Sequence, residues 1–246
     1  MTDPTPLWRT AEHADLAVLE QAWGAHRLSQ ILGAALGSYN RRGNVDARTA
    51  GAVLGVSEGT IRRWVRNGVP ASKMQAVIDL VRPPQGAFEL EHSDLIVARQ
   101  NLAIVTADPQ KGADLWGHKG WLDRHDLAII KIAGAPVMVA RIARHDRSAT
   151  AQRNMLQGGL KDAHGHYLPP AEILTFPNYF AATIARLEIL EDVYPYRVQM
   201  PEGKLSRGGS KAWLAEAPRK PLSSYRRNPR RRTRSKAQVG VRPAAD

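Results

Sequence analysis

The sequence predicts an α+β protein that has an all-α domain at its N-terminal end, a small mixed α/β second domain and a disordered basic C-terminal tail. Apolar residues recur every three or four positions up to about residue 82, and short β-branched runs follow them. Beyond residue 200 the chain is rich in Arg, Gly, Ser and Pro and loses its apolar periodicity. We therefore expect domains at 1–82 and 89–200, a linker at 83–88 and a tail at 201–246.

The first domain opens with segments that have helical periodicity, at 14–25 and 28–36. Such helices supply the apolar surface that shorter helices need for packing. The following segment at 39–44, YNRRGN, is rich in turn formers and predicts a loop. Arg41 and Arg42 lie in this loop, where they either contact phosphate or remain solvated.

The stretch at 47–66, ARTAGAVLGVSEGTIRRWVR, has the spacing of a helix-turn-helix. Such a unit needs small residues where its two helices meet, and Ala50 and Gly51 occupy those positions. Gly55 supplies the turn, and Ser57 is the expected N-cap of the second helix. We therefore predict that the first domain is an all-α helix-turn-helix domain.

The second of these helices has one apolar and one basic side. Ile61 and Trp64 recur at helical spacing and predict the buried side, which leaves Arg62, Arg63 and Arg66 facing outward. Arginine donates two hydrogen bonds to guanine O6 and N7, or it neutralises phosphate. A helical hairpin used only for packing or for contact with a protein would share the apolar spacing, but three outward arginines on one short helix favour DNA.

The stretch LGVSEGTIRRWVRNGVPASKMQAVIDLV resembles the DNA-binding domains of the Cro/C1-type (XRE-like) family. In that family a GVS..T..RW helix is followed by (I/V)P and one more packing helix, which here corresponds to 71–81 after Pro70. The resemblance covers about residues 27–82 and implies binding of double-stranded DNA. The resemblance implies that Ser57, Glu58, Gly59, Arg62, Arg63 and Arg66 face DNA. We add the neighbouring Thr60 to these candidate DNA-binding residues.

Gly59 and Glu58 differ from the other positions in the contacts that they can make with DNA. The family often carries a polar side chain where this chain has Gly59, so sequence reading would depend mostly on the arginines. Glu58 has two interpretations: its carboxylate suits the positive end of a helix, and it can also accept a hydrogen bond from cytosine N4.

The second domain is predicted to combine strands and helices. Three short β-branched runs predict strands at 102–106, 127–132 and 137–142, of which the last two are joined by a hairpin loop. Helices are predicted at 150–156 and 177–193, and the longer one is expected to pack on the sheet. The preceding Arg82-Pro83-Pro84-Gln85-Gly86 predicts the linker, because consecutive prolines interrupt a helix.

Candidate sites in the second domain are weak. The segment DLWGHKGWLDRHD at 114–126 suits either a binding loop or a packed aromatic corner. His164 and His166, followed by Tyr167, resemble the HxH metal site of rolling-circle nucleases, in which a tyrosine attacks phosphate. The glycine between the histidines and the prolines after them favour an exposed polar loop instead.

The tail carries most of the charge. The formal net charge is +12, of which +11 belongs to residues 203–246, where 13 Lys or Arg accompany two acidic residues. Such a density favours an anionic partner, and contacts to phosphate would bind any DNA in a salt-dependent manner. The candidate DNA-binding residues here are Arg226, Arg227, Arg230, Arg231, Arg232 and Arg234.

Composition and motifs exclude several kinds of site and several classes of enzyme. The chain has no cysteine, so disulfides and thiolate zinc sites are excluded, and a cytoplasmic location without membrane segments is expected. No phosphate-binding glycine loop, nucleophile elbow or HExxH helix occurs, so we expect no enzyme and no cofactor.

The function expected from the sequence is that of a sequence-specific DNA-binding regulator of a phage, plasmid or other mobile element. The first alternative is a replication-initiation, terminal or partition protein, and the second is the HxH nuclease. Besides double-stranded DNA, the partners left open are a second copy of the chain and another protein bound through 89–200.

Overall fold

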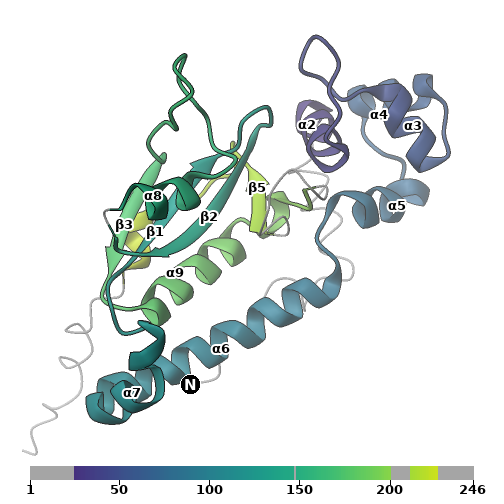
Figure 1. The fold of residues 1–246 in the computed structure, drawn as a ribbon. Coiled ribbons are helices and arrows are strands. Elements are labelled where there is room, and N and C mark those ends of the chain that lie inside the picture. Colours follow the sequence, from purple (N-terminus) through teal and green to yellow (C-terminus); the bar gives the residue numbers. More distant parts are fainter. Residues whose placement is uncertain (1–24, 147, 201–210, 227–246) are drawn as a thin grey trace, which may run out of the picture.

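The computed structural model describes residues 25–146, 148–200 and 211–226. A helical unit comes first, and a long helix, α6, leads from it to α7 at the opposite end of the molecule (Figure 1). The helices are α2 (Ala25–Leu36), α3 (Ala47–Leu54), α4 (Glu58–Asn67), α5 (Ala71–Val81), α6 (Gln85–Ala107), α7 (Pro109–Trp116), α8 (Ala149–Leu156) and α9 (Tyr179–Asp192), with 3-10 turns η1 (Gly117–Lys119), η2 (Tyr194–Tyr196) and η4 (Leu222–Tyr225). Within the described residues, no helix is both long and apolar enough to span a membrane.

An antiparallel sheet in the order β3-β1-β2-β5-β4 forms the centre of the second part. Its strands are β1 (His125–Lys131), β2 (Val137–Arg144), β3 (Glu172–Phe176), β4 (Arg197–Val198) and β5 (Ala212–Leu214). Alternate residues of β1 separate into two buried clusters, as a two-sided sheet requires. Ala128 shares one cluster with Met155 of α8, and Ile129 shares the other with Leu187 of α9.

The helical unit and the sheet share one buried cluster. Ile61 of α4 and Val77 of α5 belong to the same cluster as Val198 of β4 and Leu214 of β5. The backbone joins the two parts as well, since the Gln199 amide donates to the Val81 carbonyl at 2.8 Å. Side chains add a further link, because the Gln30 amide of α2 donates to the Glu216 carboxylate at 3.1 Å. The helical unit is therefore packed firmly against the β4–β5 side of the sheet.

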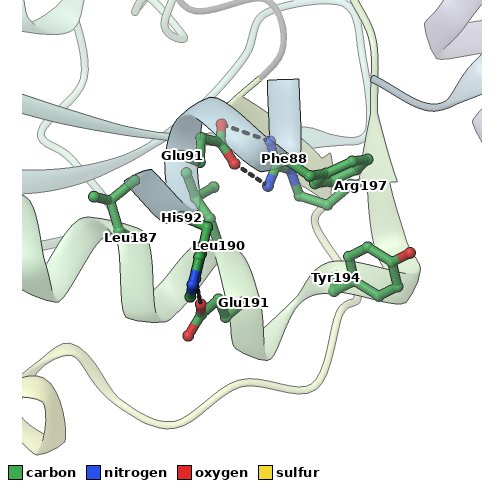
Figure 2. Close-up of a pocket in the computed structure, with 8 residues that line it drawn as sticks. All are labelled: Phe88, Glu91, His92, Leu187, Leu190, Glu191, Tyr194 and Arg197. Atoms are coloured by element: carbon green, nitrogen blue, oxygen red, sulfur yellow. Dashed lines mark hydrogen bonds and ion pairs between the residues drawn. The ribbon is translucent and has the colours of Figure 1, made fainter. Parts of the chain in front are cut away.

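A buried ion pair lies close to this junction. Arg197 of β4 is 1 % exposed and donates to both carboxylate oxygens of Glu91, at 2.9 and 3.0 Å (Figure 2). The Phe88 ring lies 5.2 Å from the Arg197 guanidinium, and Tyr194 packs edge-on against Phe88. Arg82 lies 4.4 Å from the Tyr194 ring. These contacts fix the first turns of α6 against β4.

Two predictions for the chain after residue 82 were wrong. The expected linker at 83–88 is mostly helical, because α6 begins at Gln85 with Pro84 as its N-cap, a position where proline loses no helical hydrogen bond. The expected strand at 102–106 lies inside the same helix. The β-branched residues at 102–106 favour a strand locally, but tertiary packing overrides this preference. Leu95 and Ala98 hold the helix in the cluster with α9.

The predicted tail at 201–246 was also partly wrong, because residues 211–226 are folded. Trp213 of β5 is 1 % exposed and pairs with Met138 and Arg197 in the sheet. The Glu172 carboxylate accepts from Arg219 and from the Leu222 amide. Long-range pairing of this kind has no local sequence signal, so composition alone suggested disorder. The expected tail at 201–210 and 227–246 lies outside the described residues, and so does the expected helix at 14–25 except for Ala25, the first residue of α2.

The other predicted elements agree with the structure within a few residues, whereas α7, β3, β4 and β5 were not predicted. The helices predicted at 28–36, 71–81, 150–156 and 177–193 correspond to α2, α5, α8 and α9, and the strands predicted at 127–132 and 137–142 to β1 and β2. Pairing of Lys131 with Met138 confirms the hairpin between these strands. The prediction that α9 packs on the sheet is confirmed by its shared cluster with β1.

Candidate nucleic-acid interface

The candidate interface is the outer side of α4. Ile61 and Trp64 are 0 % and 4 % exposed and hold the helix in the shared core. On the opposite side, Arg62, Arg63 and Arg66 are all exposed. Helical spacing therefore places the three guanidinium groups where the sequence predicted them, on a surface free to meet a ligand.

The turn into α4 is built from small residues. The Ser57 hydroxyl caps the helix by accepting from the Thr60 amide at 3.1 Å, as the sequence predicted. Gly55 adopts the left-handed region at φ +65°, which suits glycine. A Cβ on Gly51 would lie 2.6 Å from the Val56 carbonyl oxygen, so α3 and α4 can approach this closely only with glycine there.

Gly59 has a different environment from Gly51. It is exposed at the start of α4, and an added Cβ would have no neighbour closer than the Ser57 hydroxyl at 3.9 Å. Packing therefore does not require glycine at this position. The missing side chain instead leaves the first turn of α4 open, so that a ligand can approach its backbone closely.

The three arginines of α4 have different partners. Arg62 forms an intrahelical ion pair with Glu58, one turn earlier. Arg66 donates from Nε to the Arg62 carbonyl at 3.3 Å. Arg63 has no hydrogen bond or ion pair with any residue that the structure describes, so its guanidinium is available without breaking a contact. The sequence did not identify the Glu58–Arg62 pair, although the spacing of four residues indicates it.

The loop between α2 and α3 presents the other predicted arginines of the helical unit. Asn40 organises this loop, because its side-chain oxygen accepts from the amides of Arg42 and Asn44 at 2.9 and 3.2 Å. Arg41 and Arg42 are exposed at the tip, and the loop projects beyond the helices (Figure 1). The turn is therefore ordered while its two cationic side chains face solvent.

Sequence reasoning missed Arg48, which is exposed in the first turn of α3. Its amide donates to the N-cap Asp46 at 3.2 Å. The Thr49 hydroxyl also donates to Asp46 and holds the pKa of that carboxyl below its usual range. The signal that could have found Arg48 is an arginine directly inside a helix that an aspartate caps.

Of the candidate arginines of the tail, Arg226 lies within the described residues. Arg226 is exposed and directly follows η4. Just before it, Tyr225 donates to Asp192 at 2.6 Å, and burial together with this carboxylate raises the Tyr225 pKa well above its usual value. The chain is thus anchored on α9 immediately before its most basic stretch. The other candidates, Arg227, Arg230, Arg231, Arg232 and Arg234, lie outside the described residues.

The histidine pair of the second domain lies in an exposed loop. Asp162 organises this loop, because its carboxylate accepts from the amides of His164 and His166, both at 2.9 Å. The two rings lie 6.4 Å apart between centroids, and Nδ1 of His166 lies 3.6 Å from Asp162. Among the described residues, no three His, Cys, Asp or Glu side chains gather in a metal-binding arrangement.

The segment at 114–126 forms a packed aromatic corner. Trp116 and Trp121 both contact Phe180, with ring centroids 4.9 and 5.8 Å apart, and Trp121 stacks on Tyr179. This agrees with the second of the two interpretations that the sequence left open.

Comparison with family models, with curated proteins and with solved structures found no match.

Proposed function

We propose that this protein binds double-stranded DNA at specific sequences and acts as a transcriptional regulator of a phage, plasmid or other mobile element. The observation that carries the proposal is the face of three exposed arginines on α4, opposite a buried Ile61 and Trp64. In this proposal α3 and α4 are the two helices of a helix-turn-helix, and α4 enters the major groove.

The dimensions and the ends of α4 support this role. An α-helix with its side chains is about 10–12 Å across and fits a major groove about 12 Å wide, and the 10 residues of α4 extend about 15 Å along it. Its N-terminal turn is open at Gly59, and the positive end of the helix there favours phosphate. Arg63, free of partners in the described chain, is the side chain best placed to read a base edge. Arg41, Arg42 and Arg48 would hold the flanking phosphates.

The basic tail has a separate role in this proposal. Its charge lies in a short stretch with seven Lys or Arg among residues 226–236 and no acid, beyond Arg219 and Lys220, which pair with Glu172 and Asp192. Contacts between such a stretch and phosphate release counterions and do not depend on base sequence. The tail would therefore strengthen binding to any duplex, while α4 selects the site.

The test begins with selection of bound duplexes from a random-sequence library by the full chain. Arg63→Ala is expected to weaken binding to the selected duplex by about 1–3 kcal/mol, measured by titration, because it removes a contact to a base edge. Binding to a scrambled duplex of the same length should change little. Arg153→Ala, an exposed arginine of α8, is the matched control and should affect neither duplex.

Three outcomes would contradict or redirect the proposal. Failure to enrich any sequence would contradict sequence-specific binding. Equal losses on both duplexes would make Arg63 a contact to phosphate. Selected sites that occur as several repeats at a replication origin, rather than singly at promoters, would favour a replication or partition protein.

The Glu58–Arg62 pair leads to a further prediction. Glu58→Gln is expected to strengthen binding to a scrambled duplex by up to about fivefold, the size of one exposed ion pair, because the carboxylate no longer competes with phosphate for Arg62. Titration at two salt concentrations measures this, and the gain should shrink at the higher one. Glu89→Gln on α6 removes the same charge away from α4 and should produce no gain. Weaker binding by Glu58→Gln would instead indicate that Glu58 itself accepts from a base.

A further inference from the structure

Helix α6 has apolar residues on two opposite sides. One side belongs to the core, where Leu95 and Ala98 are buried with α9. The other side carries Leu90 and Val97, which are 69 % and 48 % exposed, and Ile104, which is half-buried. We call Leu90, Val97 and Ile104 the outer stripe. At 100° per residue these three lie within about 40° of one another and face away from the buried side.

The spacing of the outer stripe indicates a helical partner. A surface helix normally carries polar residues opposite its core-facing side. Residues 90, 97 and 104 instead form one apolar row at seven-residue spacing, which is one of the two rows by which paired α-helices contact each other. The outer stripe is long enough to follow a partner helix over four turns.

We propose that a second copy of this chain packs on the outer stripe, with the two α6 helices antiparallel about a twofold axis at Val97. In this register Leu90 of each copy contacts Ile104 of the other. The charges select the direction. The exposed carboxylates of α6, Glu89 and Asp94, both lie in its N-terminal half. Parallel pairing would place like charges side by side, whereas antiparallel pairing separates them.

The length of α6 suits the α6 pair for binding DNA at two half-sites, an inference that rests on the proposed function. The helical unit that carries α4 joins α6 at Gln85, twelve residues from Val97. At 1.5 Å per residue the N-terminal ends of two such helices would lie roughly 36 Å apart. Half-sites one turn of B-DNA apart are separated by about 34–36 Å. An antiparallel α6 pair therefore places the two points at which α6 meets its helical unit about one DNA turn apart.

Cysteine cross-linking tests the register directly, because the chain has no native cysteine. Under mild oxidation without DNA, Val97→Cys is expected to give a disulfide-linked dimer, since the twofold axis brings the two copies of this position together. Leu90→Cys alone should give no disulfide-linked dimer. Leu168→Cys, a control at another exposed apolar residue, should give none either. The double variant Leu90→Cys, Ile104→Cys should cross-link. Efficient cross-linking of Leu90→Cys alone, or none by Val97→Cys, would overturn the proposal.

Light scattering without DNA gives an independent measurement. The wild-type mass is expected to approach twice 27.1 kDa as concentration rises, and Val97→Glu should return it to 27.1 kDa with an unchanged circular dichroism spectrum. A single-chain mass up to about 100 μM, or a dimer that Val97→Glu leaves intact, would overturn the proposal. Cross-linking of Val97→Cys that appears only after removal of residues 1–24 would identify that segment as the occupant and would also overturn it.

The two proposals fail separately. A single chain that still selects a specific duplex contradicts the α6 pair and leaves specific DNA binding intact. A cross-linked dimer that binds all duplexes alike contradicts specific DNA binding and leaves the α6 pair intact.

Discussion

Arg197→Ala is expected to lower the free energy of unfolding by about 3–5 kcal/mol, the largest effect that we predict for an ion pair in this chain. The Arg197 side chain is 1 % exposed, and that of its partner Glu91 is 12 % exposed. Removal of the guanidinium leaves a carboxylate that is largely shielded from water and has lost two hydrogen bonds, at 2.9 and 3.0 Å. The Phe88 ring also loses one of its packing partners. Urea denaturation followed by circular dichroism measures the change.

Two comparisons separate the buried charge from ordinary surface effects. Lys220→Ala removes an exposed ion pair with Asp192, at 3.1 Å, and should change stability by less than about 1 kcal/mol. The double variant Arg197→Met, Glu91→Leu removes both charges and should recover a large part of the loss. A loss that is equally large in the double variant would show that packing, and not the unpaired carboxylate, explains the effect of Arg197→Ala.

Trp64→Ala is expected to lower the free energy of unfolding by about 3–5 kcal/mol, because it empties a large volume in the shared core. Trp64 is 4 % exposed and belongs to the same cluster as Leu28, Val77 and Val198. Since this cluster spans the helical unit and the sheet, thermal unfolding should remain one cooperative transition with a lower midpoint. Binding to a selected duplex should be lost at temperatures where the wild type still binds.

Val53→Ala provides the matched control for the helical unit. Val53 lies on α3 and is 54 % exposed, so its truncation should change stability by about 0.5 kcal/mol or less. Two separate transitions in Trp64→Ala, with the sheet unaffected, would contradict a shared core.

The sequence was most informative where periodicity is local. The apolar spacing of Ile61 and Trp64 determined which side of α4 is buried, and the structure places Arg62, Arg63 and Arg66 opposite. The Ser57 cap was also predictable, because an N-cap depends on residues within one turn. We propose that this surface binds DNA, and the proposal rests on the chemistry of its arginines.

Long-range contacts explain what could not be predicted. The run at 102–106 is β-branched and favours a strand locally, but α9 packs along the same helix through Leu95 and binds it through the Arg99–Glu188 pair, at 3.2 Å. In the same way, Arg197 and Glu91 are 106 positions apart, and Arg219 and Glu172 are 47 apart. No short pattern encodes such pairs. Composition therefore suggested disorder for residues that the sheet in fact incorporates.

The shared core also restricts how a protein of this kind can change its preferred DNA site, if it acts as proposed. Recombination could not exchange the first 82 residues as a cassette, because Val81 and Gln30 depend on partners at Gln199 and Glu216. Divergence would instead proceed through single substitutions on the outer side of α4. Gly59 is one permissive position, since a Cβ added there meets nothing closer than 3.9 Å.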